Sequence, residues 1–213
     1  MLKIYGFDFS SPANKVRMCA NALGLEYEYI LVNMREGEHK SDKYLSLHPA
    51  GKVPAINDDG FTLFESDAIM KYLCDKTDSS YYPKDPLKRA IVDQWCDFVS
   101  IHIHMAFVRV TFNKIVAPQM GFDVDERSLK DGLEFLGRFL PVIEGQLGKT
   151  EFLAGDELTI ADFCLLATVD PAEMIELEFA PYPKLNAWRE NLRAQEFYQK
   201  VHKFFGESMM AAE

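Results

Sequence analysis

The residues with the clearest chemical meaning lie in two short segments, Val53-Pro54 and Glu65-Ser66. Proline cannot donate a hydrogen bond to a strand ladder, so a Val-Pro step at the start of a strand is unusual. A cis bond between Val53 and Pro54 would turn the chain and leave the N–H and C=O of Val53 free to pair with an extended peptide. Glu65-Ser66 precedes a predicted helix, and the amides and positive dipole end of a helix N-terminus favour a carboxylate. Together the segments predict a site for an extended, peptide-like ligand that carries a carboxylate. Without Val53-Pro54, Glu65-Ser66 would be interpreted as an ordinary helix cap.

Both segments belong to a predicted mixed sheet in the first third of the chain. Four short runs of apolar, β-branched and aromatic residues predict strands at 2–6, 27–32, 53–56 and 61–64. Asp58-Asp59-Gly60 between the last two runs is a hairpin signal. Apolar residues at helical spacing predict one helix over 11–23 and another from Ser66 onward. This order of elements is typical of a small sheet with helices packed on it.

The rest of the chain is predicted to be helical. The composition changes between 78 and 86 to Ser, Tyr, Pro, Lys and Asp, which predicts a linker. Beyond it, apolar residues repeat at helical spacing from Ile91 to Met105 and from Leu129 to Ile143. Thr159 and Asp162 are placed to form a capping box, which is a more economical interpretation of Asp162 than a catalytic acid. We therefore expect an α+β protein, with a mixed α/β domain at 1–78, a linker at 79–86 and an all-α domain at 87–213.

Composition and charge exclude several classes of protein. The 213 residues include 23 Lys and Arg against 33 Asp and Glu, a net charge of −10. A uniformly basic surface for nucleic acid or an anionic membrane is thereby excluded. No apolar stretch approaches the roughly 20 residues that span a bilayer, and the N-terminus reads as a strand rather than a cleavable signal. We expect a soluble, cytoplasmic protein without nucleic-acid or membrane partners.

The four cysteines are scattered and form no CxxC pair or zinc-type cluster. We expect them to be buried free thiols, and no metal site is predicted.

The ordered set of motifs resembles the cytosolic glutathione transferases, most of all the phi-type members, with theta-type and related bacterial groups close behind. The motifs are Gly37-Glu38-His39-Lys40, then His48-Pro49 to Pro54, then Phe64-Glu65-Ser66, and the capping segment 158–162. The resemblance covers nearly the whole chain. It implies a thioredoxin-like first domain that binds glutathione, an all-α second domain, a two-fold homodimer, and no cofactor beyond glutathione as cosubstrate.

The resemblance also implies roles for single residues of the first domain. Val53, beside Pro54, would hold the cysteinyl backbone of glutathione, and Glu65 and Ser66 would hold its γ-glutamyl end. The residues expected near the glycyl carboxylate are His39, Lys40 and Lys52. Family members often carry Gln at the position of Lys52, and a solvated polar loop is an equal alternative for His39 and Lys40.

The catalytic residue is expected where the first strand meets the first helix. Thioredoxin-like redox enzymes carry a reactive cysteine there, but this chain has Ser10 and Ser11. Ser10 aligns with the serine of the phi-type pattern, and its hydroxyl would stabilise the glutathione thiolate by a hydrogen bond beside the helix N-terminus. Ser11, followed by Pro12, is expected to cap the helix beside the glutathione site, and it is the alternative to Ser10 as the thiolate donor. Asn14 is expected to support the serine.

The second substrate is expected to be a small, largely apolar electrophile bound against the first long helix. The candidate residues are His102, Met105, Phe107, Arg109 and Phe112. Core packing is an equal interpretation of Met105 and Phe107, and a solvated face is an alternative for Arg109. The predicted function is glutathione conjugation in detoxification, and the alternative is a non-catalytic relative that acts by binding or in stress response. Pro12 counts against the isomerase branch, which has a Ser-Ser-Cys run at this point.

Overall fold

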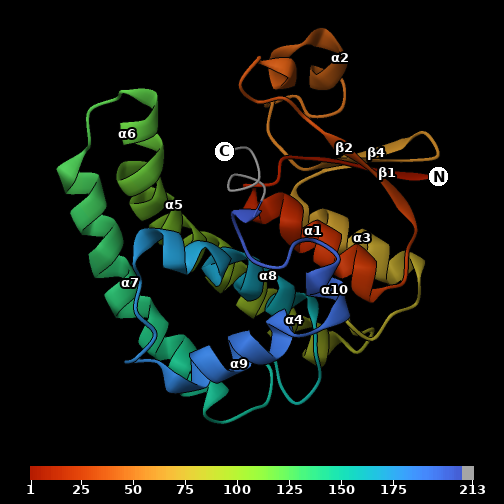
Figure 1. Ribbon diagram of the computed structural model, residues 1–213. Coiled ribbons are helices and arrows are strands. Elements are labelled where there is room, and N and C mark those ends of the chain that lie inside the picture. Colours follow the sequence, from red (N-terminus) through yellow and green to blue (C-terminus); the bar gives the residue numbers. More distant parts are fainter. Residues whose placement is uncertain (208–213) are drawn as a thin grey trace. The chain divides into compact units, whose positions relative to one another are not determined.

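The computed structural model describes residues 1–207 of the chain, which fall into two compact units (Figure 1). The first unit consists of residues 1–83 together with 193–207, and the second of residues 84–192. The boundary between them lies within the expected linker. The segment from Arg193 onward, which the sequence placed in the helical domain, is instead part of the first unit.

The first unit is built on a four-stranded mixed sheet, as the sequence predicts. Its strands are β1 (Leu2–Gly6), β2 (Tyr27–Leu31), β3 (Ala55–Asp58) and β4 (Phe61–Phe64), in the order β2-β1-β3-β4. β1 runs parallel to β2, while β3 is antiparallel to both β1 and β4. Ile4 of β1 lies opposite Ile56 of β3, and both side chains are fully buried. The sheet therefore contributes directly to the core of this unit.

Two helices, α1 (Ser11–Ala22) and α3 (Ser66–Lys76), pack against each other, and Figure 1 shows them side by side on one face of the sheet. The buried residues that α1 and α3 contribute to the core include Val16, Cys19, Ala20, Ile69, Met70, Leu73 and Cys74. The short helix α10 (Glu196–Gln199) packs on α1, where the side-chain amide of Asn21 donates to the carbonyl of Phe197 over 3.0 Å. Burial of Phe197 and Tyr198 explains why this segment belongs to the first unit.

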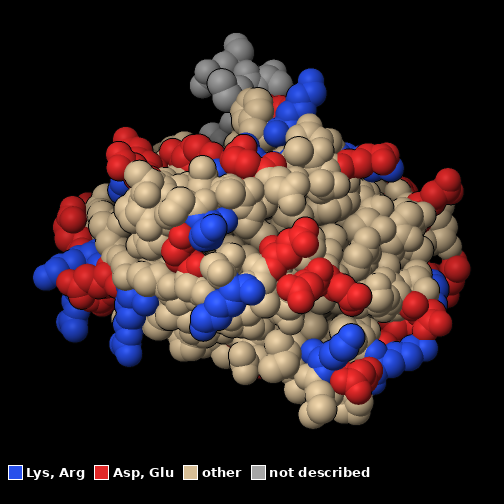
Figure 2. Space-filling model, turned by 90° about the horizontal axis from the view of Figure 1, so that it is seen from below, with Lys and Arg blue, Asp and Glu red and all other residues tan. Residues whose placement is uncertain are grey.

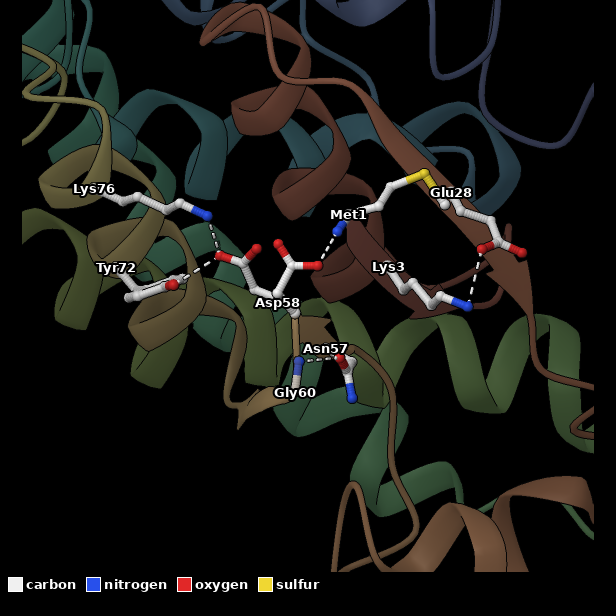
Figure 3. A network of polar contacts seen from close by, with 9 residues as sticks. Met1, Lys3, Glu28, Asn57, Asp58, Gly60, Tyr72 and Lys76 are labelled. Carbon is white, nitrogen blue, oxygen red and sulfur yellow. Dashed lines mark hydrogen bonds and ion pairs between the residues drawn. The ribbon is translucent and has the colours of Figure 1, made fainter.

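The β3–β4 hairpin is tied to α3 by a polar network (Figure 3). The carboxylate of Asp58, at the end of β3, accepts hydrogen bonds from the Tyr72 hydroxyl at 2.7 Å and from the Lys76 ammonium. In the turn itself, the amide of Gly60 donates to the side chain of Asn57 over 2.9 Å. These bonds hold the hairpin in place against the helix that follows it.

The second unit is helical, as expected. An uninterrupted helical run covers 86–120, comprising α4 (Pro86–Phe98), η2 (Val99–His104), α5 (Met105–Thr111), η3 (Phe112–Val116) and α6 (Ala117–Met120). The segments η2 and η3 are π-helical, which the sequence pattern did not predict. The remaining helices are α7 (Glu126–Leu147), α8 (Ile160–Val169), η4 (Asp170–Ile175) and α9 (Pro183–Arg193).

The packing of the second unit centres on α8, in which every residue is buried. The predicted capping box at its start is confirmed, because the amide of Thr159 donates to the Asp162 carboxylate over 2.9 Å. α7 packs closely on α5. A Cβ atom at Gly132 would come within 2.9 Å of the Val110 side chain, so glycine permits this approach.

Three expectations about the chain as a whole can be compared with residues 1–207. All four cysteines are buried and free, as predicted. No group of three or more His, Cys, Asp and Glu side chains in this range could hold a metal ion, and none of the helices in it has the length and apolar character needed to cross a membrane. On the face drawn in Figure 2, acidic and basic side chains are interspersed.

Candidate functional site

Two helix N-termini meet at one end of the first unit. Near the start of both helices, the ammonium of Lys15 on α1 lies 2.5 Å from the carboxylate of Asp67 on α3. Further along both helices, the Sγ atoms of Cys19 and Cys74 lie 3.9 Å apart. α1 and α3 therefore run in the same direction, and their positive dipole ends lie on the same side. This arrangement brings the segments ending at Ser10 and at Glu65-Ser66 to one place, suited to an anionic ligand.

Ser10 is the N-cap of α1. Its backbone is extended, at φ −93° and ψ 100°, and its Oγ accepts a hydrogen bond from the amide of Ala13 over 3.2 Å. Ser11 is the first helical residue, so the expectation that Ser11 caps the helix is wrong. Proline is tolerated at either of the first two helical positions, because neither needs its N–H, so Pro12 does not by itself locate the cap. Accepting the bond from Ala13 leaves the hydroxyl hydrogen of Ser10 available for donation to a ligand.

The loop before Ser10 is held by buried polar groups. Asn14, which is fully buried, donates from its side-chain amide to the carbonyl of Asp8 over 2.8 Å. By holding Asp8, Asn14 therefore supports the loop that carries Ser10. The guanidinium of Arg17 lies 4.0 Å from the centre of the Tyr29 ring and 3.4 Å from the Asp8 carboxylate. Burial raises the pKa of the Tyr29 hydroxyl, which keeps it protonated.

The Val53-Pro54 segment has the conformation that the sequence suggested. The peptide bond between Val53 and Pro54 is cis. β3 begins only at Ala55, so the N–H and C=O of Val53 lie outside the β1–β3 and β3–β4 pairings. The adjoining carbonyl of Lys52 accepts a hydrogen bond from the Tyr44 hydroxyl over 2.7 Å. The backbone of this segment is therefore anchored on one side, while Val53 remains available for pairing with a ligand.

Tyr44, which anchors the carbonyl next to Val53, is a residue that the sequence interpretation missed. It belongs to the short helix α2 (Asp42–Leu45), and its side chain is buried, with its ring edge-on to Tyr5 at 6.3 Å. Burial raises the pKa of its hydroxyl, so this group remains a hydrogen-bond donor at neutral pH. The available signal was a tyrosine that directly follows the polar stretch 33–43.

Glu65 adopts a strained backbone conformation immediately before α3. Its φ of +70° and ψ of 112° lie outside the regions that side-chain-bearing residues normally occupy. The Glu65 side chain is exposed and makes no capping hydrogen bond to any described residue. It therefore does not act as an ordinary side-chain cap of α3. Residues with a backbone as strained as that of Glu65 are found preferentially at ligand sites. Ser66 follows as the first residue of α3.

The residues expected near the glycyl carboxylate differ in their surroundings. His39 and Lys40 lie in the short helix η1 (Glu38–Lys40), which packs on Gly51, where a Cβ would come within 2.8 Å of the His39 carbonyl. The Nδ1 atom of His39 is buried and has no hydrogen-bond partner among the described residues. The side chains of Lys40 and Lys52 are exposed.

His48 is buried beside Phe64, with the two rings 4.8 Å apart, and its Nδ1 accepts from the Ala50 amide over 3.3 Å. Burial lowers the pKa of His48, and the Glu65 carboxylate acts in the opposite direction. His48 thus links the strained Glu65 segment to the turn before Val53.

The residues expected to contact the second substrate lie in the second unit and differ in exposure. His102, Met105 and Phe112 are exposed, the latter two by 50% and 42%. Arg109 is half-buried, with Nη1 3.4 Å from the Ser128 hydroxyl. Phe107 is only 2% exposed and belongs to the core of this unit.

The sequence and the structure of the chain are similar to those of known proteins. The family model "Glutathione S-transferase, N-terminal domain" matches residues 1–75, and "Glutathione S-transferase, C-terminal domain" matches residues 99–196. Glutathione S-transferase F13 of Arabidopsis thaliana is 34% identical over 212 residues, covering 94% of each chain. Glutathione transferase F2 from Populus trichocarpa is similar in structure, with a TM-score of 0.87, 30% identity and 100% of both chains covered. A structure of glutathione S-transferase-I bound with lactoylglutathione has a TM-score of 0.86 and 30% identity, covering 94% of this chain and 97% of that one.

Proposed function

Because the chain belongs to the glutathione S-transferase family, we propose that Ser10 activates the thiol of glutathione by donating a hydrogen bond to it. The protein is an enzyme that conjugates glutathione. The observation that carries the assignment of Ser10 is its place as N-cap of α1. Its Oγ is fixed by the Ala13 amide, and its hydroxyl hydrogen is left for the ligand.

The energetic demand on Ser10 is modest. A free thiol has a pKa of about 8.5, so only about 3% of it is thiolate at pH 7. Lowering this pKa by about two units requires about 2.7 kcal/mol. A hydrogen bond to a charged acceptor contributes about 1.5–3 kcal/mol, and the end of a helix dipole adds about 0.3–1 kcal/mol. One hydroxyl at the start of α1 is therefore sufficient, and the nucleophile is the thiolate of glutathione itself.

The rest of the site supports an extended tripeptide beside Val53. The unpaired backbone of Val53 would hold the cysteinyl residue, next to Pro54, while Glu65 and Ser66 would hold the γ-glutamyl end at the start of α3. Three further side chains would lie near the glycyl carboxylate: His39, Lys40 and Lys52. Of these, His39 has a buried Nδ1 with no hydrogen-bond partner among the described residues. Ser11 would contribute through its position in the first turn of α1.

The test of Ser10 is a comparison of three variants. Ser10→Ala removes both the cap and the thiol donor, so it costs about 1 kcal/mol of stability and raises the pKa of the bound thiol by about two units. Turnover at neutral pH should fall about 25-fold, because the thiolate fraction at pH 7 drops from about 76% to about 3%, while the KM for glutathione stays within a few-fold. Ser10→Thr keeps the hydroxyl and Ser11→Ala leaves Ser10 in place, so both should retain most of the activity.

The measurement is the ultraviolet absorbance of the glutathione thiolate across pH, together with conjugation of a chlorinated nitrobenzene. Unchanged thiolate absorbance at neutral pH in Ser10→Ala would exclude Ser10 as the donor. If the thiolate absorbance falls in Ser11→Ala but not in Ser10→Ala, Ser11 is the hydrogen-bond donor to the thiolate.

The electrophile is proposed to be a small, largely apolar molecule that contacts the helical run 101–112. His102, Met105 and Phe112 support this because they are exposed there, and Arg109 would favour an anionic group. Phe107, being buried, would act through packing. A panel of electrophiles at fixed glutathione concentration would identify the preferred class and separate conjugation from dehalogenation and peroxide reduction.

Family membership also supports a homodimer that acts in cytoplasmic detoxification, with no cofactor other than glutathione as cosubstrate. The resemblance implies that α3 and α4 lie near the dimer interface. The exposed apolar residues Leu87 and Ile91 of α4 support this. Sedimentation would decide the oligomeric state, and dialysis against a chelator without loss of activity would establish independence from metal ions.

A further inference from the structure

An ion pair between Lys15 and Asp67 joins the two helices at the end where the glutathione site lies. Nζ and Oδ1 are 2.5 Å apart, and the two side chains are only 9% and 26% exposed. Lys15 is on α1, five residues after Ser10, and Asp67 directly follows Ser66 on α3. The pair therefore connects the segment that is proposed to hold the thiol of glutathione with the segment that is proposed to hold its γ-glutamyl end.

Stability alone is a weak explanation for this pair. Removing a lysine and an aspartate from water costs free energy, which the attraction between them often only repays. An apolar contact would serve stability at least as well, and most of the buried residues of α1 and α3 are apolar. They include Cys19, Cys74 and Leu73. An ion pair differs from an apolar contact because it joins two defined atoms, one on each helix.

Apolar helix contacts are non-directional, so they resist separation more than they resist sliding. A slip of one turn along the axis would move α3 by about 5.4 Å. Even a shift of about 1 Å in a catalytic group can cost about a hundredfold in rate. Ser10 and Ser66 lie on different helices, so both can contact one tripeptide only if the register of α1 against α3 is held.

Charge gives the pair a second effect on the same site. Asp67 lies in the first turn of α3, next to the amides that are proposed to receive the γ-glutamyl carboxylate. An uncompensated Asp67 would repel that carboxylate, and Lys15 supplies the opposite charge at 2.5 Å. Loss of Lys15 should therefore weaken binding of the γ-glutamyl carboxylate more than loss of the Asp67 charge does.

We propose that Lys15 and Asp67 are positioning residues that hold Ser10 and Ser66 in register for a single glutathione and keep the start of α3 receptive to its γ-glutamyl carboxylate. This inference rests on the proposed function of the site. It assigns no contact between the pair and the reacting sulfur.

The experiment compares substitutions of the pair with two control variants. Lys15→Met should raise the KM for glutathione about tenfold, because it loses the register and removes the positive charge next to Asp67, beside the ligand. Asp67→Asn should raise this KM less, because the charge that remains is positive. Lys15→Arg should restore most of the affinity. Asp67→Glu keeps both charges but adds one methylene group, so it should raise KM a few-fold even where Lys15→Met fails to fold.

The controls separate positioning from general stability. Cys74→Ala creates a small void at the same helix interface, away from the helix starts, and should lower Tm without changing the KM for glutathione. Lys3→Met removes the exposed pair that Lys3 forms with Glu28 at 3.2 Å in the same unit and should change neither quantity.

The readouts are the KM and kcat for glutathione, the pH dependence of thiolate absorbance, and Tm. If the Lys15 and Asp67 variants lower Tm as Cys74→Ala does but keep the wild-type KM and thiolate profile, the pair is structural only and the proposal is overturned. If the wild-type protein itself shows no glutathione-dependent thiolate absorbance, the proposed role of Ser10 fails instead.

Discussion

Removal of one hydroxyl, by the substitution Tyr44→Phe, tests how the backbone beside Val53 is held. The Tyr44 hydroxyl donates to the Lys52 carbonyl over 2.7 Å, while its ring is buried and packs edge-on against Tyr5. Phenylalanine keeps the ring contacts and removes only this bond. The substitution therefore isolates the link between α2 and the segment that is proposed to pair with glutathione.

The magnitude follows from the geometry. A neutral hydrogen bond contributes about 0.5–1.5 kcal/mol to folding, and a carbonyl left without its partner adds to the loss. We expect Tyr44→Phe to lower the free energy of unfolding by about 1–2 kcal/mol. If about 1 kcal/mol of this is expressed in binding, the KM for glutathione rises about fivefold. kcat should change little, because Ser10 is untouched. Since burial raises the pKa of Tyr44, the effect should be constant from pH 6 to pH 9.

The assay combines denaturant unfolding with steady-state kinetics at varied glutathione. Tyr5→Phe is the matched control, because it removes a hydroxyl from the other member of the same ring pair. A Tyr44→Phe variant that loses stability but keeps the wild-type KM for glutathione would refute the link between this bond and the site. An equal rise in KM for Tyr5→Phe would attribute the effect to the ring pair instead.

Two buried carboxylates are expected to affect stability in opposite directions as pH changes. Hydrogen bonds from Lys76 and then Tyr72 lower the pKa of Asp58, so its contribution is present above the unfolded-state value of 3.8 and is lost as pH falls below it (Figure 3). Unfolding measurements across pH should show that the free energy of unfolding of Tyr72→Phe falls less in acid than that of the wild type. Burial raises the pKa of Asp162 from 3.8 to about 6, so its contribution is present at low pH and is lost as pH rises between these values. Relative to Asp162→Asn, which does not titrate, wild type should lose about 3 kcal/mol over this range, and a flat difference would contradict the assignment.

The features that could be predicted from the sequence are those with local causes. A proline at a strand start, Pro54, restricts the backbone of its neighbours, and a turn such as Asp58-Asp59-Gly60 depends on residues adjacent in the chain. The capping box of Thr159 and Asp162 likewise involves only one helical turn. These interactions arise between near neighbours, so their residue types are informative without knowledge of the fold.

The prediction for the start of α1 was less successful, because two adjacent serines compete for one cap. Ser10 and Ser11 have the same capping chemistry, and Pro12 is compatible with either choice. The path of the loop from β1 decides between them, since Asn14 holds the Asp8 carbonyl and thereby sets where the helix begins. Packing also determines which unit contains the C-terminal segment. This segment contacts α1 through Phe197, which is buried, although no local sequence pattern predicts that contact.

Residue types and spacing were thus enough to indicate the architecture and the family, and to single out the two segments proposed to bind the ligand, because these features rest on backbone restrictions or helix ends encoded within a few residues. The pairing of Lys15 with Asp67, the bond from Tyr44 to Lys52 and the burial of Phe107 join or cover positions distant in the chain. Such contacts depend on how helices and strands pack in three dimensions. A single sequence specifies this packing through many weak interactions at once, and only the folded molecule reveals which of them are made.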